Sequence, residues 1–318
     1  MTRFRASCAG AAAGILLDRA FGEPRVALHP VARFGQAMLS LENRIHRDSR
    51  GRGVVFALVG VVAAAATAAA LEKTVAPVAR NRHSLRFLTT ALVSWIAIAG
   101  RMLGDVARDI EEPLRTGDLA VARRELRSLV GRDTTSLASP EVARAVTESV
   151  AENTVDAVVA PALWGAIGGP VGAAAYRAVN TLDAMVGHRT ERYARFGWAS
   201  ARLDDVANWI PARCTAALVA AVRPGQARDV SRVVRRDAPA HPSPNSGVAE
   251  AAFAAAIGVR LGGVNHYGDR TEDRGTLGDG LEPDVAAIGD ARVLLRQVSL
   301  ALVVALVLTA GAPGLVRG

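Results

Sequence analysis

The sequence predicts an all-α membrane protein, a polytopic bundle of four or five transmembrane helices joined by polar helical loops. Half of the 318 residues are apolar and the mean hydropathy is positive. A soluble domain of this length can fill its core without such an excess. The apolar residues also gather in runs about as long as a hydrocarbon core is thick. The alternative that these runs leave open is a large soluble protein with buried helices.

The two clearest runs lie near the ends of the chain. Residues 54–71 and 299–316 carry no charged residue. The run 87–103 contains one charged residue, Arg101, close to its end, where a long side chain can reach the membrane interface. We therefore expect each of these three segments to span the membrane as a helix.

Two further runs contain polar residues. Residues 157–179 are interrupted only by Tyr176 and Arg177, whereas residues 206–222 contain Asn208 and Arg213 and predict a span more weakly. The expected spans, all within one membrane domain of residues 1–318, are 54–71, 87–103, 157–179, 206–222 and 299–316.

The remaining segments predict helices and loops beside the spans. The apolar stretch Ala9–Leu17 is too short to cross a bilayer, and we expect a helix that packs against the membrane or partly enters it. In the first polar region, 104–156, amphipathic helical periodicity extends to Gly131. A loop follows, and then a helix with Ser139 as N-cap and Pro140 at its first position. In the second polar region, 223–298, an Ala-rich helix precedes a loop rich in glycine and aspartate.

Composition excludes several classes of protein. The net charge is +8, but no run of basic residues alternates with aromatic ones, so basic flanks of membrane spans explain the charge and we expect no nucleic-acid partner. Cys8 and Cys214 stand in apolar surroundings and form neither a disulfide framework nor a metal motif. The chain also lacks a phosphate-binding G-x-x-x-x-G-K-[ST] loop and a zinc-binding H-E-x-x-H pair.

A row of carboxylates lies at the entrance of one apolar run. Glu148, Glu152 and Asp156 are spaced four residues apart, so a helix would place them along one face. Acidic groups at membrane depth are costly and commonly mark function. Carboxylate and amide oxygens suit a hard cation such as Mg²⁺, which often bridges to phosphate oxygens. A simpler interpretation is that Glu148 forms a helix-face ion pair with Arg144.

Other polar residues also stand beside apolar segments, and each group has a simpler structural interpretation. Asn180 and Asp183 could end a span, Asp204 and Asp205 could cap a helix, and the sequence HPSPNSG could be a turn before a helix. The remaining members of these groups are Arg132, Asp133, Asn153, Asn208, Arg213, Ser243, Asn245, Ser246 and Glu250.

Taken in order, these segments resemble the CobD/CbiB family of integral membrane proteins, the adenosylcobinamide-phosphate synthases of cobalamin assembly. The segments that carry the resemblance are LLDRAFGEPRVALHPV, GRDT, ESVAENTVDAVVAP, NTLDAMVG, ARLDDVANWIPAR and HPSPNSGVAEAAFAAAIGVRLGGVNHYG. They extend over about residues 15–270. Glu23, Ala184 and Cys214 depart from the residues common in the family.

The resemblance implies a multi-pass protein of the cell membrane that performs an ATP-dependent amide ligation. The expected substrates are adenosylcobyric acid, through a propionate carboxylate, and aminopropanol or its phosphate. The expected product is adenosylcobinamide or its phosphate, with ATP and Mg²⁺ as requirements. The lipid bilayer is an expected partner, and other enzymes of the cobalamin pathway are candidate partners.

Residue type suggests how the polar groups divide this work. We expect Glu148, Glu152, Asp156 and Asp205 to be catalytic, and Glu152, Asp156, Asp204 and Asp205 to hold the metal. Arginines suit phosphate, and amides suit phosphate or the corrinoid amides. The expected substrate-binding residues are Arg132, Asp133, Asn153, Asn180, Asp183, Arg213, Ser243 and Asn245.

Two other classes of protein would also place charges next to membrane spans. A transporter of a corrinoid or small anion would accumulate its substrate in vesicles without forming an amide. A non-catalytic assembly subunit would ligate nothing and would co-purify with other enzymes of the pathway. The long polar regions outside the spans favour an enzyme.

Overall fold

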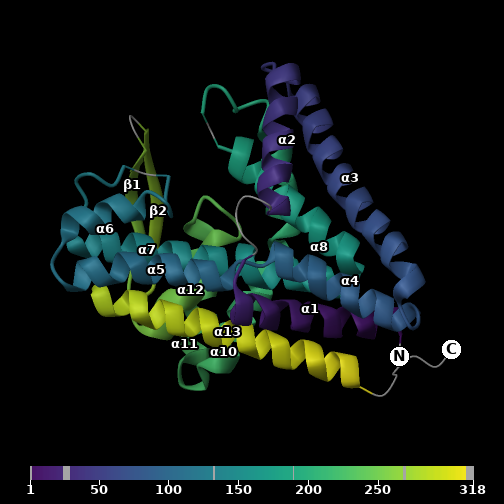
Figure 1. Cartoon of the computed structure of the whole chain (residues 1–318). Helices are drawn as coiled ribbons and strands as arrows, with labels where there is room; N and C mark the ends of the chain where they lie inside the picture. Colours follow the sequence, from purple (N-terminus) through teal and green to yellow (C-terminus); the bar gives the residue numbers. More distant parts are fainter. Residues whose placement is uncertain (1, 24–28, 132, 189, 268–269, 313–318) are drawn as a thin grey trace. The chain divides into compact units, whose positions relative to one another are not determined.

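The computed structural model describes residues 2–23, 29–131, 133–188, 190–267 and 270–312, and these are predominantly helical (Figure 1). The prediction of an all-α polytopic membrane protein is confirmed, with one small β-hairpin in addition. The described chain forms two compact units. Unit 1 comprises the described parts of residues 1–99, 156–208 and 302–318, and unit 2 those of 100–155 and 209–301. That the chain forms one membrane domain stays a prediction.

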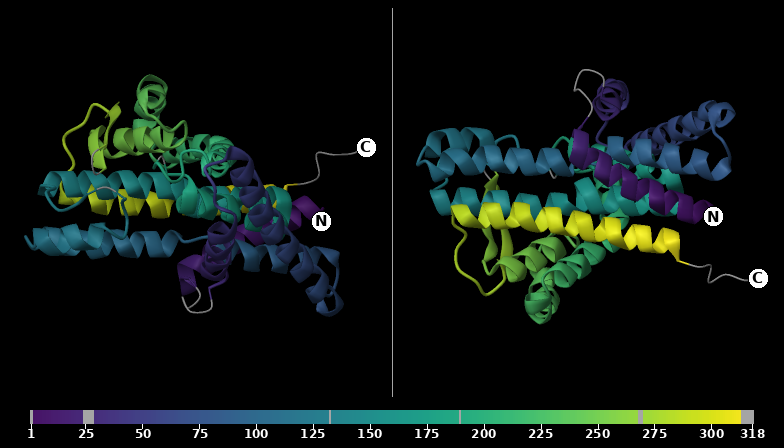
Figure 2. Two further views of the ribbon diagram at one scale, coloured as in Figure 1. Left: turned by 90° about the horizontal axis from the view of Figure 1, so that it is seen from above. Right: turned by 60° about the horizontal axis from the view of Figure 1, so that its bottom comes forward.

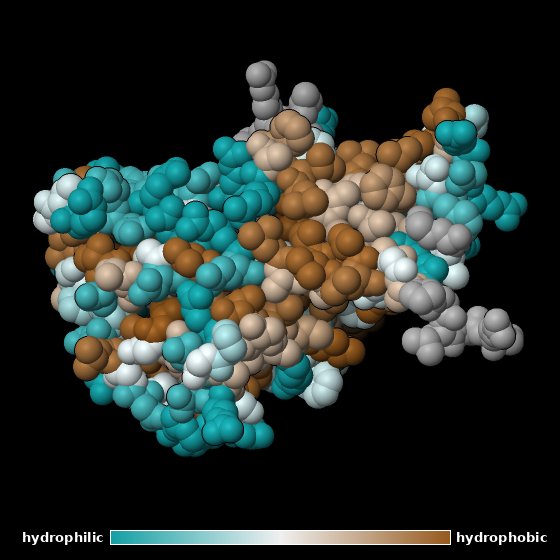
Figure 3. Space-filling view, turned by 90° about the horizontal axis from the view of Figure 1, so that it is seen from below, coloured by the Kyte–Doolittle hydropathy of each residue, from teal (hydrophilic) through white to brown (hydrophobic). Residues whose placement is uncertain are grey.

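Among the described residues, four helical segments are long and apolar enough to cross a membrane, namely Arg50–Val78, Arg82–Arg115, Ser139–Val186 and Val285–Gly311. They contain the predicted spans 54–71, 87–103 and 157–179 and residues 299–311 of the predicted span 299–316, of which residues 313–316 lie outside the described residues. The space-filling view of Figure 3 shows a broad apolar zone, as expected for a surface in contact with lipid. Large apolar side chains that are exposed include Val55, Leu58, Val62, Val304, Val307 and Leu308.

The predicted span 206–222 is not one continuous helix. The chain forms two shorter helices there, α9 (Trp198–Ala207) and α10 (Trp209–Val222). Asn208 ends α9, and its side-chain amide donates a hydrogen bond of 2.9 Å to the Asp204 carboxylate of the preceding turn. Local bonding by an asparagine competes with the helical backbone, so the helix stops where hydropathy alone predicted that it would continue.

Unit 1 is built around α1 (Arg3–Phe21), α4 (Arg82–Ala97) and α8 (Ala160–Val186), which lie side by side in Figures 1 and 2. Small residues permit this close packing. A Cβ atom at Gly10 would lie 2.7 Å from the Phe87 carbonyl oxygen, and one at Gly14 only 2.6 Å from the Ser94 Cβ. The other helices of this unit are α2 (Pro30–Ile45), α3 (Arg50–Val75) and α9.

Helix α8 has a break at Gly169, where φ is +64° and Pro170 follows. Proline lacks the amide hydrogen that a continuous helix would use, so a backbone carbonyl is released. The Arg86 guanidinium donates a hydrogen bond of 2.8 Å to the Gly168 carbonyl and pairs with the Glu72 carboxylate at 3.2 Å. A side chain from α4 thus donates a hydrogen bond to a carbonyl group at the break in α8.

Unit 2 surrounds α12 (Ser246–Ile257), an Ala-rich helix whose residues are almost all buried. The predicted Ala-rich helix is therefore confirmed, and it ends at Gly258 with φ +74°. Helix α7 begins at Ser139, with Ala138 as N-cap rather than Ser139, a difference of one residue. The other helices are α5 (Gly100–Arg115), α6 (Leu119–Leu126), α10 and α11 (Ala227–Asp237), together with α7 (Ser139–Thr154) and most of α13 (Val285–Gly311).

The expected loop after α12 is wrong over part of its length. Strands β1 (Leu261–Tyr267) and β2 (Arg270–Leu277) pair as an antiparallel hairpin, with Leu261 opposite Leu277. The pairing is irregular between Gly262 and Val264, where two successive glycines have positive φ. Glycine-rich strands without alternating hydrophobic residues leave no clear signal in the sequence.

Candidate functional site

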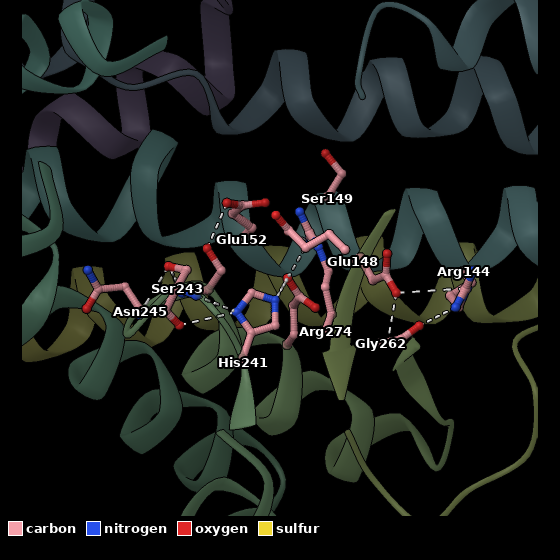
Figure 4. A network of polar contacts seen from close by, with 12 residues as sticks. Arg144, Glu148, Ser149, Glu152, His241, Ser243, Asn245, Gly262 and Arg274 are labelled. Atoms are coloured by element: carbon pink, nitrogen blue, oxygen red, sulfur yellow. Dashed lines mark hydrogen bonds and ion pairs between the residues drawn. The ribbon is translucent and has the colours of Figure 1, made fainter. Parts of the chain in front are cut away.

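Most of the polar residues that the sequence analysis selected, among those described, lie in two clusters, one within each unit. The cluster of unit 2 is drawn in Figure 4 and combines α7 with the turn before α12 and with the hairpin. Glu148 and Glu152 both project from one side of α7, as their spacing predicted. Asp156 follows in the π-helical turn Val155–Val159 and belongs to unit 1.

Glu148 is 3% exposed and binds the hairpin. Its Oε1 accepts a hydrogen bond of 2.9 Å from the Gly262 amide and lies 3.9 Å from Arg144 Nε. The Arg144 guanidinium in turn donates to the Gly262 carbonyl. The ion pair suggested by the sequence is therefore present, and together the two side chains hold both polar groups of one glycine.

Glu152 faces the start of α12. Its Oε1 accepts a hydrogen bond of 2.7 Å from the Ser246 hydroxyl, and the side chain is only half-buried. The neighbouring Asn153 donates to the Ser149 carbonyl one turn earlier, at 2.9 Å. Of the carboxylates on α7, Glu152 thus combines a polar partner with access from outside, as a group that meets a substrate must.

His241 connects the HPSPNSG turn to the interior of unit 2 (Figure 4). His241 Nδ1 lies 3.1 Å from the Ser243 amide nitrogen and 3.2 Å from the Ser243 carbonyl oxygen, and Nε2 lies 3.7 Å from Glu250 Oε1. Burial, together with the positive charge of Arg274, lowers the pKa of His241, so the imidazole is neutral near pH 7. The Ser243 hydroxyl accepts from the Ser246 amide at 3.2 Å, so the turn also leads into α12 as the sequence suggested.

Glu250 is the one charged residue in the sequence of α12, and its side chain is fully buried. Arg274 NH1, from β2, lies 3.6 Å from Glu250 Oε1. The sequence analysis gave no role to His241, Glu250 or Arg274. A lone glutamate in an Ala-rich helix was a usable signal, because a buried carboxylate requires a partner, whereas the distant Arg274 could not be assigned to it.

Arg213 and Asn245, both expected to bind substrate, lie together in unit 2. Arg213 NH1 donates to Asn245 Oδ1 at 3.2 Å, and its guanidinium stacks over the Trp209 ring at 4.3 Å. Asp133 lies on an exposed loop, where its carboxylate accepts the Thr135 amide at 2.9 Å. Arg132 lies outside the described residues.

The cluster of unit 1 is a chain of polar groups between α8 and α9. The Tyr176 hydroxyl donates a hydrogen bond of 2.8 Å to Asn208 Oδ1 and lies 3.4 Å from Asp156 Oδ1. Asn208 in turn donates to Asp204 Oδ2 at 2.9 Å, and Asn180 Nδ2 lies 3.5 Å from Asp204 Oδ1. Tyr176 was noted in the sequence only as an interruption of an apolar run; here it links residues of two motifs.

Asp204 and Asp183 form the acidic centre of this cluster. Burial raises the pKa of Asp204 to about 7, and repulsion from the nearby Asp183 carboxylate adds to the effect. A bound cation would oppose both effects. Neither Asp204 nor Asp205 caps a helix, because both lie within α9, and Asp205 pairs with Arg202 at 3.4 Å.

The oxygen donors of the unit 1 cluster fit the chemistry of Mg²⁺. They are the carboxylates of Asp183 and Asp204 and the amides of Asn180 and Asn208, and Mg²⁺ commonly uses one or two carboxylates, with water and substrate phosphate completing its shell. Within the described residues, no group of three or more His, Cys, Asp or Glu side chains is arranged to hold a metal. A common metal site of Glu152, Asp156, Asp204 and Asp205 stays a prediction, because these residues are divided between the two units.

Comparison with known proteins identifies related chains. A family model described as CobD/Cbib protein matches residues 11–295. The cobalamin biosynthesis protein CobD of Mycobacterium tuberculosis (strain ATCC 25618 / H37Rv) is 47% identical over 292 residues, 91% of each chain. The proteins of the same name from Geobacter metallireducens and Halalkalibacterium halodurans are 43% and 38% identical, each over 93% of this chain and 94% of the relative. No solved structure matches the chain.

Proposed function

This chain belongs to the CobD/Cbib protein family, and we propose that it is a membrane-bound amide ligase of cobalamin biosynthesis. Its relatives are named cobalamin biosynthesis proteins, which supports a role in that pathway. The proposed reaction joins aminopropanol, or its phosphate, to a propionate carboxylate of adenosylcobyric acid with consumption of ATP. The cell membrane is the proposed location, since four helices are suited to span a bilayer.

The chemistry of the reaction explains why carboxylates and phosphate-binding groups are needed together. A carboxylate does not react with an amine at a useful rate, so it must first be activated. Transfer of the γ-phosphoryl group of ATP to a carboxylate oxygen gives an acyl phosphate and ADP. Attack of the amine nitrogen on the acyl carbon then forms the amide and releases phosphate and a proton. Positioning and neutralisation of charge supply most of the catalysis in such a transfer.

The unit 2 cluster fits the amine half of the reaction. Glu152, half-buried and 2.7 Å from the Ser246 hydroxyl, can bind the ammonium form of the substrate and accept the proton released on amide formation. Glu148 is already engaged by the Gly262 amide, so we assign it to holding the hairpin beside Glu152. The buried His241 and Glu250 fix the turn that carries Ser246.

The unit 1 cluster fits the phosphate half. Asp183 and Asp204 would hold Mg²⁺, which would neutralise charge on the transferred phosphoryl group. Asn180 and Asn208 orient the Asp204 carboxylate from two sides. Asp205 is less suited, because it pairs with Arg202 on the surface of α9. Other enzymes of the pathway are proposed partners.

The observation that carries the proposal is the grouping of the ordered family motifs into two polar clusters. Glu152 meets Ser246 across 94 residues of sequence, and Asn180 meets Asp204 across 24. Each cluster contains carboxylates with amide or hydroxyl partners, which a purely structural helix face would not require.

A labelling experiment tests the proposal. Purified protein in detergent is incubated with adenosylcobyric acid carrying ¹⁸O in its free carboxylate, aminopropanol phosphate and Mg-ATP. We expect an amide product, ADP and labelled phosphate. The phosphate should carry one ¹⁸O atom whenever the carboxylate oxygen that attacked the γ-phosphorus was labelled. Label in AMP would contradict the acyl phosphate, and recovery of unreacted substrates would contradict ligation.

Two matched pairs of variants assign the residues. We expect Glu152→Gln and Asp204→Asn to lower turnover at least about 100-fold, the usual scale for a lost acid–base or charge-stabilising group. Glu125→Gln and Asp48→Asn are the controls, since both carboxylates make surface ion pairs. Near-normal turnover in Glu152→Gln or in Asp204→Asn would remove that residue from the proposed machinery.

A further inference from the structure

A second polar group in unit 1 lies where α2 begins. His29 is the N-cap residue of α2 and is 6% exposed. Within the described part of the chain, its Nε2 atom is buried without a hydrogen-bond partner. Buried polar atoms are nearly always satisfied in folded proteins, so an unsatisfied one in a native structure calls for a ligand, an ion or a water molecule.

Arg177 of α8 shows the same feature. Its Nε atom is also buried without a partner among the described residues, and its NH1 lies 3.4 Å from Asn180 Oδ1. Helix α2, which begins after His29, packs against α8, which carries Arg177. Burial and the positive charge of Arg177 both lower the pKa of His29, in agreement with this packing. Two buried polar atoms without a partner among the described residues, on helices that pack against each other, thus lie in one corner of unit 1.

The start of α2 adds a third feature to this corner. None of the described side chains caps the first turn of α2, which contains no acidic residue. The free amide groups and the dipole of a helix N-terminus favour an anion. α2 is 16 residues long, so its dipole is fully developed.

We propose that His29, Arg177 and the first turn of α2 bind the phosphate group of a substrate. An arginine fork, an imidazole N–H and helix-terminal amides are the donors that phosphate oxygens accept most readily. The corner adjoins the acidic cluster through Asn180, which contacts both Arg177 and Asp204. The inference rests on the proposed ligation, because its substrates supply the phosphate. The bound group is a phosphate of ATP or the phosphate of aminopropanol phosphate.

Glu23 provides an internal test of this assignment. Burial raises the pKa of Glu23, while the charge of Arg177 opposes the rise, so this carboxyl also lies near the guanidinium. A carboxylate beside an anion site repels the ligand. Removing its charge should therefore strengthen phosphate binding, whereas a purely structural ion pair with Arg177 would predict no gain.

Equilibrium dialysis of the full chain in detergent, with Mg²⁺ present, tests the site without requiring turnover. Labelled ATP and labelled aminopropanol phosphate are the two probes. We expect Arg177→Gln to weaken binding of at least one probe by about tenfold or more, and His29→Gln by about fivefold. The probe that loses affinity identifies the source of the phosphate. Glu23→Gln should bind the same probe more tightly than the wild type.

Arg195→Gln is the matched control, because Arg195 is an arginine of unit 1 that pairs with Asp48 on the surface, with 61% of its side chain exposed. Wild-type affinity for both probes in Arg177→Gln and His29→Gln would overturn the inference, as would weaker binding in Glu23→Gln. If Arg177→Gln does not fold, the other two variants test the site: we expect His29→Gln to bind the probe more weakly and Glu23→Gln to bind it more tightly. If the wild-type protein forms the amide but all variants bind both probes normally, the phosphate site is contradicted and the proposed function stands. If the variants change binding as expected but no amide forms, the phosphate site stands and the proposed function is contradicted.

Discussion

Glu148 allows a direct test of the structural role that separates it from Glu152. The change is Glu148→Ala. It removes a carboxylate that accepts the Gly262 amide at 2.9 Å and pairs with Arg144 at 3.9 Å, in a side chain that is 4% exposed. The Gly262 amide is then left buried without an acceptor, and Arg144, whose side chain is 18% exposed, loses its carboxylate.

The magnitude follows from these two losses. An unsatisfied buried amide costs about 1–3 kcal/mol, and breaking a buried ion pair about 3–5 kcal/mol. Because Arg144 keeps partial access to solvent and also donates to the Gly262 carbonyl, we expect the lower part of this range, about 2–4 kcal/mol. Glu148→Gln keeps an acceptor oxygen and should cost only about 1 kcal/mol.

Unfolding of the purified protein in detergent, followed by helical circular dichroism, measures both changes. Glu152→Gln is the comparison, because its half-buried side chain should change stability by less than about 1 kcal/mol while turnover falls. Equal stability of wild type and Glu148→Ala would refute the role assigned to Glu148. A loss in Glu148→Gln as large as that in Glu148→Ala would show that the charge, not the hydrogen bond to Gly262, is decisive.

Three further predictions concern unit 1. Arg86→Gln should lower the free energy of unfolding by about 3 kcal/mol or more, because the poorly exposed Glu72 carboxylate loses its partner; unchanged denaturation would contradict this. Without Mg²⁺, stability should fall as pH rises from about 4 to about 7 and then level off, since folded Asp204 keeps a proton that the unfolded chain releases near 3.8. Asp204→Asn should flatten that slope in pH-dependent unfolding curves. Asp205→Asn should change unfolding by less than about 1 kcal/mol, since its ion pair with Arg202 is solvent-exposed; a larger loss would show that Asp205 has an interior role.

Hydropathy was sufficient to predict the membrane-spanning helices, because each needs a long run of apolar residues whatever its neighbours are. It did not indicate the interruption within residues 206–222, where the side chain of Asn208 bonds to the preceding turn and ends α9. It also gave no sign of the break in α8, although Gly169 and Pro170 are visible in the sequence. There the structure depends on Arg86 from another helix.

The site could be predicted only where its geometry is local. The spacing of Glu148 and Glu152 fixed their common face, since a helix repeats every 3.6 residues. The pairing of Arg274 with Glu250 depends on how the hairpin folds back onto α12, and no periodicity encodes that. The hairpin itself is glycine-rich, and Gly262 is held in place by side chains of α7 more than one hundred residues earlier.

The stoichiometry of the reaction tests the central claim most directly. Purified protein is supplied with adenosylcobyric acid, aminopropanol phosphate and Mg-ATP. The corrinoid and the nucleotides are then identified and quantified over time by mass spectrometry. The account predicts a corrinoid heavier by one aminopropanol phosphate less one water, with one ADP and one phosphate formed for each amide. Hydrolysis of ATP without a heavier corrinoid, or no consumption of either, would contradict it.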